Sequence, residues 1–332
     1  MTEPLLEVAD LHTWFVTEAG VLRAVNGVSL AVEAGERVAI VGESGSGKSV
    51  TALSIMRLVD PPAGRIVRGR VVLRGRDLLA MGERELRRVR GREIALVFQD
   101  PMSSLDPVFT IGDQLVETIR LHRPLGRREA RRIAVESLEA VGIADAARRL
   151  DEYPHRFSGG MRQRVVIAIA LSCNPSLLIA DEPTTALDVT TQDQILELLA
   201  GLADERGMAV VLITHDLGVV AGFCERVNVM YAGRIVEAGS ADDVFARPRH
   251  PYTWGLLGSV TRLDRPVAPR LPAIPGSPPS LVEPPPGCPF QPRCRFADDR
   301  SRAHVPLLRE LTPGHLVACH RAEELALRPS TA

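Results

Sequence analysis

Residues 42–49 read Gly42-Glu43-Ser44-Gly45-Ser46-Gly47-Lys48-Ser49. A short apolar run, Glu36–Gly42, leads into this segment, and Val50–Leu58, which has helical spacing, follows it. The eight residues fit the pattern G-x-x-x-x-G-K-[ST] in its required context, after a strand and before a helix. Glycines let consecutive backbone N–H groups point at phosphate oxygens, and the helix start adds a partial positive charge. The segment therefore predicts a nucleotide phosphate site.

Two side chains of this segment carry its expected chemistry. Lys48 can reach the β- and γ-phosphates of a nucleotide, and the Ser49 hydroxyl can ligate Mg²⁺. A chance Gly/Ser turn is the alternative, but it would explain neither the full pattern nor its flanks. We therefore expect a nucleotide to be bound by the following residues: Gly42, Glu43, Ser44, Gly45, Ser46, Gly47, Lys48, Ser49 and Val50.

A second segment ends in two acids. The apolar residues Leu177–Ala180 precede Asp181 and Glu182. A buried strand would deliver Asp181 to the edge of the sheet beside the phosphate loop, where it could hold Mg²⁺ directly or through water. Glu182, one residue further, could polarise a water molecule for in-line attack on the γ-phosphate. The pair is a candidate for the catalytic centre.

Alternating patterns indicate the fold class. Helix and strand patterns alternate from residue 160 to residue 240, which implies a mostly parallel sheet with helices on its faces. Residues 5–9 and 25–32 alternate apolar and polar positions, which predicts antiparallel edge strands. Apolar residues in 110–150 recur at helical spacing. We expect an α/β fold with a mostly parallel sheet, an antiparallel β subdomain and a helical subdomain.

Composition excludes several classes of protein. Lys plus Arg is 40 and Asp plus Glu is 41, giving a net charge of −1, and only 4% of residues are aromatic. This balance gives no general reason to bind nucleic acid. The sequence shows neither a secretion signal nor a run of about 18 apolar residues. We expect a cytoplasmic protein whose membrane association comes through a partner, with its five cysteines as thiols or metal ligands.

The composition changes near residue 265. Residues 266–286 hold nine prolines, which predicts a stiff, extended connector. A small Cys- and Arg-containing tail follows, too short to bury a core of its own. We expect one large domain at about 1–260 and an extension at 261–332.

One further segment carries a family resemblance. Phe157-Ser158-Gly159-Gly160-Met161-Arg162-Gln163-Arg164 resembles the signature motif of ATP-binding-cassette (ABC) proteins. The resemblance implies that the signature residues contact the γ-phosphate of a nucleotide held by the opposite subunit. A Ser hydroxyl and Gly N–H groups at a helix start form an anion site, which makes this role physically reasonable. Met161 stands where many members have Gln. The signature contacts are assigned to Ser158, Gly159, Gly160 and Met161.

Other positions match the same family. Gln99 resembles the residue that senses Mg²⁺ and water and couples to the membrane partner. Asp188, in Ala186-Leu187-Asp188, resembles the loop that crosses the dimer interface, and His215 resembles the switch histidine at the γ-phosphate. Phe15 resembles the aromatic residue that stacks on adenine, with Trp14 as its neighbour. The resemblance thus implies catalysis by Glu182, His215 and Gln99, and Mg²⁺ ligation by Ser49, Gln99 and Asp181.

The resemblance narrows to the dipeptide, oligopeptide and nickel importers. The segments 153–164 and 180–190 resemble that subfamily, and Arg249–Thr253 resembles the His-Pro-Tyr element that opens its C-terminal extension. The match covers roughly residues 5–320. It implies a P-loop NTPase cassette at 1–260, with a helical signature subdomain at about 100–170, that powers peptide import from the cytoplasmic face of the membrane. It also implies three kinds of partner: a second, related ATP-binding subunit, two membrane-spanning permease subunits and an external binding protein.

Several rival functions remain open. Import of nickel or another small solute fits the same subfamily. A soluble cassette ATPase acting on nucleic acid or ribosomes usually carries coiled-coil insertions or two cassettes, and this sequence has neither. A P-loop kinase would lack the Ser-Gly-Gly signature. A non-hydrolysing regulatory module is disfavoured because Glu182 and His215 are both present.

The tail cysteines suggest a metal site. Cys288 and Cys294 are spaced C-x₅-C, and Cys319 follows 25 positions on. The subfamily resemblance implies a four-cysteine segment that can hold a [4Fe–4S] cluster, but Ser301 stands where one of the four is expected. The fourth ligand would then be His320, His315 or the Ser301 oxygen. Zinc tolerates three Cys and one His, and three reduced thiols are the remaining alternative.

Overall fold

The computed structural model describes residues 3–100, 104–185, 187–259, 274–325 and 327. Contacts divide the chain into two compact units. The first consists of Met1–Val32, Arg37–Leu79 and Ile213–Ala332, and the second of Glu33–Glu36 and Ala80–Leu212. The chain passes from the second unit back to the first within one strand, β8 (Ala209–Thr214).

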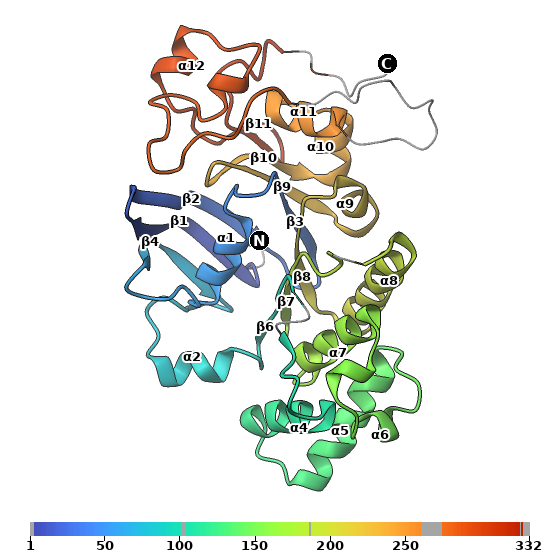
Figure 1. Cartoon of the computed structure of the whole chain (residues 1–332). Helices are drawn as coiled ribbons and strands as arrows, with labels where there is room; N and C mark the ends of the chain where they lie inside the picture. The colour runs from blue at the N-terminus through green and yellow to red at the C-terminus, as the bar shows by residue number, and fades with distance from the viewer. Residues whose placement is uncertain (1–2, 101–103, 186, 260–273, 326, 328–332) are drawn as a thin grey trace. The chain divides into compact units, whose positions relative to one another are not determined.

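The first unit contains the predicted antiparallel sheet. Its strands are ordered β2-β1-β4-β5, with bounds β1 (Leu6–Thr17), β2 (Gly20–Val32), β4 (Gly64–Leu73) and β5 (Arg76–Asp77). The buried side chains of β1 include Leu6, Val8 and Leu11. Helix α1 (Lys48–Ile55) lies against this sheet (Figure 1), and the Thr13 and Ser54 hydroxyl oxygens are 2.7 Å apart. This contact ties the helix of the phosphate loop to β1.

A second set of strands in the first unit includes the C-terminal tail. Strand β3 (Arg37–Val41) pairs in parallel with β9 (Arg226–Tyr231), and β9 pairs in antiparallel fashion with β10 (Arg234–Ser240). The order continues through β12 (His315–Val317) to β11 (Arg309–Thr312). The tail therefore does not need a core of its own, because it extends this sheet. The short helices are α9 (Leu217–Phe223), α10 (Ala241–Ala246), α11 (Pro251–Gly258), η2 (Gln291–Arg293) and α12 (Asp299–Ala303).

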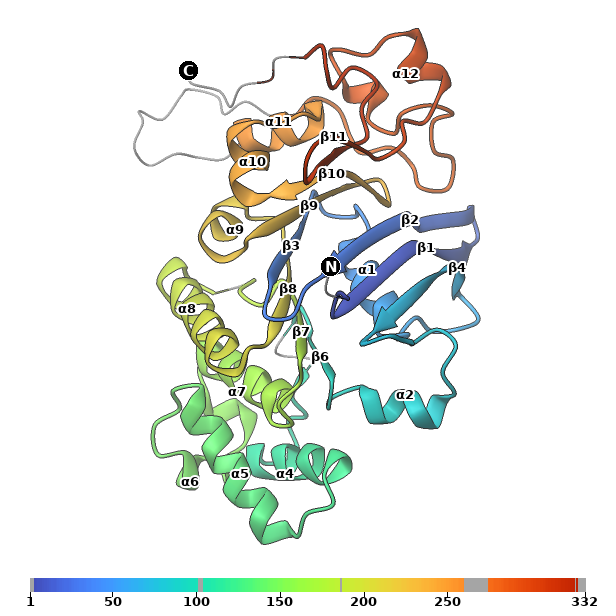
Figure 2. The same ribbon diagram turned by 180° about the vertical axis from the view of Figure 1, so that it is seen from behind.

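The second unit combines parallel strands with the predicted helical region. Strand β6 (Ile94–Val97) pairs in parallel with β7 (Leu177–Asp181), and β8 lies beyond β7 in the sheet order. Figure 2 shows α4, α5 and α6 gathered in one group, which α7 joins to the strands. The helices are α2 (Glu83–Val89), α4 (Ile111–His122), α5 (Arg127–Ala140), α6 (Ala146–Arg149), η1 (Pro154–Arg156), α7 (Gly159–Leu171) and α8 (Val189–Arg206).

Side-chain caps explain where these helices begin. Ser158 accepts a hydrogen bond from the Met161 N–H and caps the start of α7 at Gly159. Asp188 caps α8 in the same way, and Gly207, at φ 60°, ends it. The expected α/β fold with an antiparallel sheet and a helical region is confirmed. Among the described residues, no helix is both long enough and apolar enough to cross a bilayer.

A buried carboxylate joins the extension to the sheet. Glu237, on β10, is fully buried and accepts hydrogen bonds from the backbone N–H groups of Arg249 and His250, at 2.7 and 3.0 Å. Its Oε1 also lies 2.7 Å from Nε2 of His315, on β12. Burial lowers the pKa of His250 to about 4, so this ring is neutral, and its Nδ1 accepts the Tyr252 N–H. Glu237 thus fixes the start of α11 and the first residue of β12.

We expect Glu237→Ala to lower the free energy of unfolding by about 3 kcal/mol, because it leaves buried hydrogen-bond donors without an acceptor. Denaturant unfolding of the purified chain measures the change. Glu323→Ala is the control, since Glu323 pairs with Arg309 at a largely exposed site, where an ion pair contributes about 0–1 kcal/mol. Equal losses from the two substitutions would contradict the role given to Glu237.

Candidate active site

The phosphate loop joins β3 to α1 through backbone conformations that require glycine. Gly47 has φ 106°, and a Cβ added there would lie 2.2 Å from the carbonyl oxygen of Ala24. Gly42 has φ 154°, and its added Cβ would lie 2.2 Å from the carbonyl oxygen of Met230. The loop therefore passes close to the backbones of β2 and β9, where a side chain has no room.

Two polar groups of the loop suit a polyphosphate. The Lys48 side chain is buried, and its ammonium donates to the carbonyl oxygens of Gly42 at 2.8 Å and Glu43 at 3.1 Å. The positive charge of Lys48 thus lies next to the backbone of the phosphate loop. Among the residues that the structure describes, the buried Ser46 Oγ has no hydrogen-bond partner. A buried hydroxyl of this kind normally binds a ligand or water, so the loop fits a phosphate oxygen at this place.

The adenine candidate lies on β1. Phe15 is half-buried and pairs with Gly64 on β4, where an added Cβ would lie 2.6 Å from the Phe15 ring. The ring of neighbouring Trp14 is covered by the guanidinium of Arg23, whose central carbon is 5.4 Å from the ring centroid. Of the two aromatic rings, Phe15 is the better candidate for stacking on a base.

The acidic pair of the second unit lies at the end of β7, as predicted. Asp181 is buried as the last residue of the strand, and Glu182 follows with φ 47°. Such a conformation is strained for a residue with a side chain, and strained residues cluster at functional sites. Gln99 Nε2 donates to Glu182 Oε2 at 3.1 Å, and the Thr185 hydroxyl donates to the same oxygen at 2.8 Å. No local sequence pattern predicts this contact of Thr185.

The signature residues occupy the start of α7. Ser158 Oγ accepts from the Met161 N–H at 3.4 Å, and Gly159 and Gly160 form the first turn. A Cβ added at Gly160 would lie 2.7 Å from the Thr191 methyl group on α8. Asp188 accepts hydrogen bonds from both the backbone and the hydroxyl of Thr191, at 3.0 and 2.7 Å. Thr191 therefore joins the two motifs, and Ala186 of the Asp188 loop lies outside the described residues.

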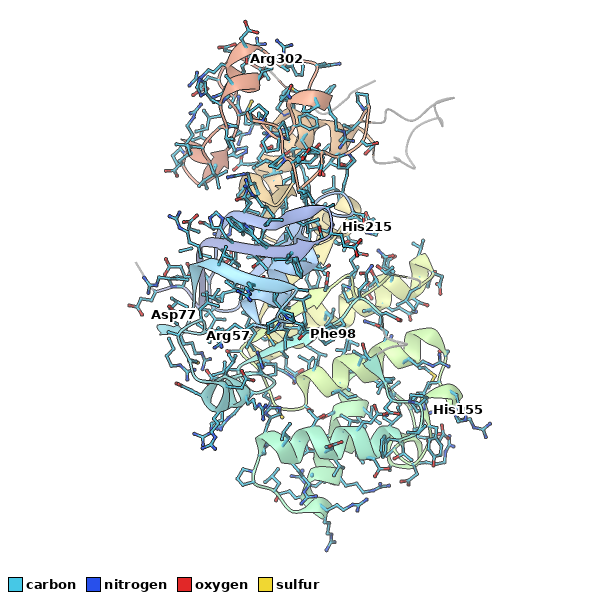
Figure 3. The ribbon with its side chains drawn as sticks, turned by 60° about the vertical axis from the view of Figure 1, so that its left-hand side comes forward. Arg57, Asp77, Phe98, His155, His215 and Arg302 are labelled. Atoms are coloured by element: carbon cyan, nitrogen blue, oxygen red, sulfur yellow. The ribbon has the colours of Figure 1, made fainter. Side chains whose placement is uncertain are left out.

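The remaining predicted residues follow strand ends. His215 is exposed directly after β8 (Figure 3), and Asp216 then caps α9 by accepting the Gly218 N–H at 2.8 Å. Gln99 is exposed after β6, next to Phe98, whose side chain is 46% exposed (Figure 3). Residues 101–103, which follow in the sequence, lie outside the described residues.

The candidate residues divide between the two units. The first unit contains Phe15, the phosphate loop and His215, and the second contains Gln99, Asp181, Glu182, the signature residues and Asp188. Contacts within each unit bring Gln99 to Glu182, and Lys48 to Gly42 and Glu43. The loop has two further partners that the motif does not predict: Tyr252, whose hydroxyl oxygen lies 2.8 Å from the Glu43 nitrogen, and Arg293, which pairs with the Glu43 carboxylate.

The tail cysteines converge on one small cavity. Cys288, Cys294 and Cys319 line it together with Ser301 and His320. Backbone N–H groups point at all three sulfurs; that of Arg321, for example, lies 3.4 Å from Cys319 Sγ. Burial raises the pKa of the Cys288 and Cys319 thiols to about 11, so without a metal both are protonated at neutral pH.

The candidate fourth ligands all have other partners. Ser301 Oγ donates to the Asp298 carbonyl oxygen in a capping box at the start of α12, and His315 binds Glu237. His320 Nε2 lies 2.9 Å from the carbonyl oxygen of His304. Within the described parts of the chain, no group of three or more His, Cys, Asp and Glu side chains is placed to hold a metal ion. The donor set is therefore incomplete as it stands.

Two family models match this sequence. A model described as "ABC transporter" matches residues 25–185, and one described as "Oligopeptide/dipeptide transporter, C-terminal region" matches residues 236–300. The chain is 56% identical to a probable peptide ABC transporter ATP-binding protein of Sinorhizobium fredii, over 97% of this chain and 96% of that protein. It is 53% identical to a putative peptide import ATP-binding protein of Brucella melitensis, over 98% and 99% of the two chains.

Solved structures show the same architecture. A dimeric ATP-binding cassette in a post-hydrolysis state, bound to ADP and phosphate, aligns with a TM-score of 0.64 at 30% identity, covering 71% of this chain and 98% of that chain. A cassette from Clostridium perfringens, part of an ABC transporter complex, aligns with a TM-score of 0.62 at 28% identity, covering 74% and 91%. The part of this chain outside these alignments exceeds a quarter of its length.

Gly47→Ala should lower the free energy of unfolding by about 3 kcal/mol, because strain at positive φ is added to a clash with the Ala24 carbonyl. Gly45→Ala is the matched control. Gly45 has φ 78°, but among the described residues no atom lies within 4 Å of its added Cβ, so only about 1 kcal/mol of strain is expected. Denaturant unfolding of both variants tests the difference, and equal losses would contradict the packing described for Gly47.

Proposed function

The chain belongs to the family of ABC transporter ATP-binding proteins, and we propose that it is the subunit that hydrolyses ATP to drive peptide import. The relatives named above are described as peptide transporters or peptide importers. The match of residues 236–300 to an oligopeptide and dipeptide transporter region supports the same substrate class. Import of nickel or another small solute is the alternative within this family. We assign the cassette to residues 1–260 and the extension to 261–332.

One observation supports hydrolysis most directly. The Glu182 carboxylate follows the buried end of β7 and accepts hydrogen bonds from Gln99 and Thr185. Held in this way, it acts as the base that accepts a proton from the attacking water, while Gln99 orients that water. Lys48 and the loop N–H groups neutralise the β- and γ-phosphates. His215 binds the γ-phosphate, and Phe15 stacks on adenine.

Magnesium fits the oxygen donors of this site. Ser49, Gln99 and the buried Asp181 carboxylate supply the hard oxygen ligands that Mg²⁺ prefers. We propose that these residues would hold the ion, whose positive charge would offset the negative charge that develops on the phosphates during transfer.

A complete site requires a second cassette. The chain has one phosphate loop and one signature helix, and the signature residues would bind the nucleotide of the opposite subunit. The Ser158 hydroxyl and the N–H groups of Gly159 and Gly160, at the start of α7, form an anion site suited to that γ-phosphate. The dimeric cassette bound to ADP and phosphate supports this arrangement. Asp188 would lie at the dimer interface, and the partner would be a related but distinct subunit.

Coupling to the membrane is proposed for the Gln99 segment. Phe98, Val108 and Phe109, near Gln99 in sequence, are all large apolar residues with exposed side chains. Exposed apolar groups of this kind mark docking surfaces. The transporter would contain two membrane-spanning permease subunits, and we propose that this segment binds a helix of one of them at the cytoplasmic face. We also propose that an external binding protein delivers the substrate. Closure of the two cassettes on ATP would move the permeases, and hydrolysis would release them.

Replacing Glu182 by Gln tests the catalytic assignment. The amide cannot accept the proton, so turnover of the assembled transporter should fall by a factor of about 100 or more, with ATP still bound in a trapped dimer. Phosphate release from proteoliposomes and ATP titration measure the two effects. Glu205→Gln, at an exposed position near the end of α8, serves as the control and should leave turnover unchanged. Near-normal hydrolysis by the Glu182 variant would rule out this role.

We further propose that Cys288, Cys294 and Cys319 are the protein ligands of an iron–sulfur cluster. Their sulfurs line one cavity and face backbone N–H groups, and hydrogen bonds to the sulfurs are one of the factors that tune such clusters. Clusters usually take four thiolates, and here three cysteines are available, because Ser301 hydrogen-bonds to the backbone of Asp298 in the capping box of α12. A zinc site and three reduced thiols are the alternatives.

Anaerobic purification followed by iron, sulfide and zinc analysis distinguishes these three states. We expect a brown protein with iron and sulfide near stoichiometric, and loss of both in Cys294→Ser. The matched control is Cys224→Ser, at a buried cysteine directly after α9 in the first unit, and this variant should keep its iron. A colourless, metal-free protein with a protease-sensitive tail would eliminate both metal sites.

A further inference from the structure

Glu43 is the residue of the phosphate loop that the rest of its unit holds most firmly. Its backbone N–H donates to the Tyr252 hydroxyl oxygen at 2.8 Å. Its carbonyl oxygen accepts from the Lys48 ammonium at 3.1 Å. Its carboxylate accepts two hydrogen bonds from Arg293, at 2.6 and 3.0 Å. Amide, carbonyl and side chain are thus each fixed by a different residue.

Two of these three contacts come from the C-terminal part of the chain. Tyr252 belongs to α11 and Arg293 to η2, 209 and 250 residues from Glu43. The Arg293 side chain is only 4% exposed. Its Nε donates to the Pro275 carbonyl oxygen at 2.9 Å, and its guanidinium carbon lies 5.8 Å from the centroid of the Tyr231 ring. A guanidinium held this rigidly binds a carboxylate in one orientation.

The charge of Glu43 makes this pairing important for ATP. The loop binds a polyanion, and a free carboxylate inside it would repel the phosphates, since charges at partly buried sites interact strongly. The bidentate ion pair offsets that charge and fixes the carboxylate against Arg293. The Lys48 ammonium donates to the carbonyl oxygen of Glu43. A shift of Glu43 would therefore also displace the Lys48 ammonium.

We propose that Arg293 is a positioning residue for ATP, acting through Glu43, and that the extension therefore sets the nucleotide affinity of the phosphate loop. This proposal rests on the ATP-binding function above. Arg293 need not touch the nucleotide. It neutralises and orients the one acidic side chain of the loop, while Tyr252 fixes the same residue's backbone.

Suppression by a second substitution tests this mechanism. Arg293→Met leaves the Glu43 carboxylate unpaired, so the Kd for ATP should rise about tenfold, the effect of about 1.4 kcal/mol. Glu43→Gln removes the charge, so the double variant, Arg293→Met with Glu43→Gln, should regain most of the affinity. Arg293→Lys keeps the charge without the bidentate geometry. Its Kd for ATP should lie between those of Arg293→Met and the unsubstituted chain. Fluorescence titration of the full-length chain with ATP measures each Kd.

Arg295→Met is the matched control. Arg295, two residues along, is exposed and places its guanidinium carbon 4.3 Å from the Trp254 ring centroid. Its loss should leave the Kd for ATP unchanged. Because the unsubstituted chain is titrated first, a failure to bind ATP there would count against the ATP-binding function itself rather than against Arg293.

Two results would overturn the proposal. One is an unchanged Kd in Arg293→Met. The other is a raised Kd that Glu43→Gln does not restore, since the loss of affinity would then not come from the unpaired Glu43 charge. If Arg293→Met does not fold, Arg293→Lys still decides: it should weaken ATP binding severalfold, and adding Glu43→Gln to it should restore most of that loss. The opposite pattern would refute the role of the ion pair.

Discussion

The phosphate loop passes between two backbone carbonyl oxygens, those of Ala24 and Met230, with no space for a side chain at Gly47 or Gly42. Strands β2 and β9 supply these carbonyls, so the loop's shape depends on a strand near the start of the chain and another near residue 230. This close packing of backbone against backbone fixes the path of the loop. The rest of the first unit is arranged to keep these three segments in contact.

Charge imposes a second constraint on this unit. A loop that contains both a lysine and a glutamate must keep the two from pairing across the place where phosphates bind. Here the lysine interacts with backbone carbonyl oxygens, and the glutamate is drawn to an arginine in the extension. A buried glutamate on β10 fixes the start of α11 and β12, and so supports the tyrosine that binds the loop. The extension is thus joined to the site by two separate carboxylates.

Much of the site could be predicted because its motifs are local. The phosphate loop, Asp181 and Glu182 lie at strand ends, and spacing alone identifies them. Thr185 was missed because its hydrogen bond to Glu182 depends on how the chain turns after β7. Arg293 could not be found, since no local pattern links residues 250 positions apart. The pairing of β10 with β12 was missed for the same reason, and Ser301 proved to be a helix cap rather than a free ligand.

The distance along the chain between Glu43 and Arg293 has a consequence for biosynthesis. A ribosome that adds about 5–20 residues per second needs roughly 12 to 50 s to make the 250 residues that separate them. During that time the loop has emerged, but the guanidinium that orients it does not yet exist. A nascent or prematurely terminated polypeptide therefore carries the nucleotide motif with its glutamate unrestrained. Full-strength ATP binding becomes a property of the finished chain, which limits unproductive nucleotide capture by fragments that could never assemble.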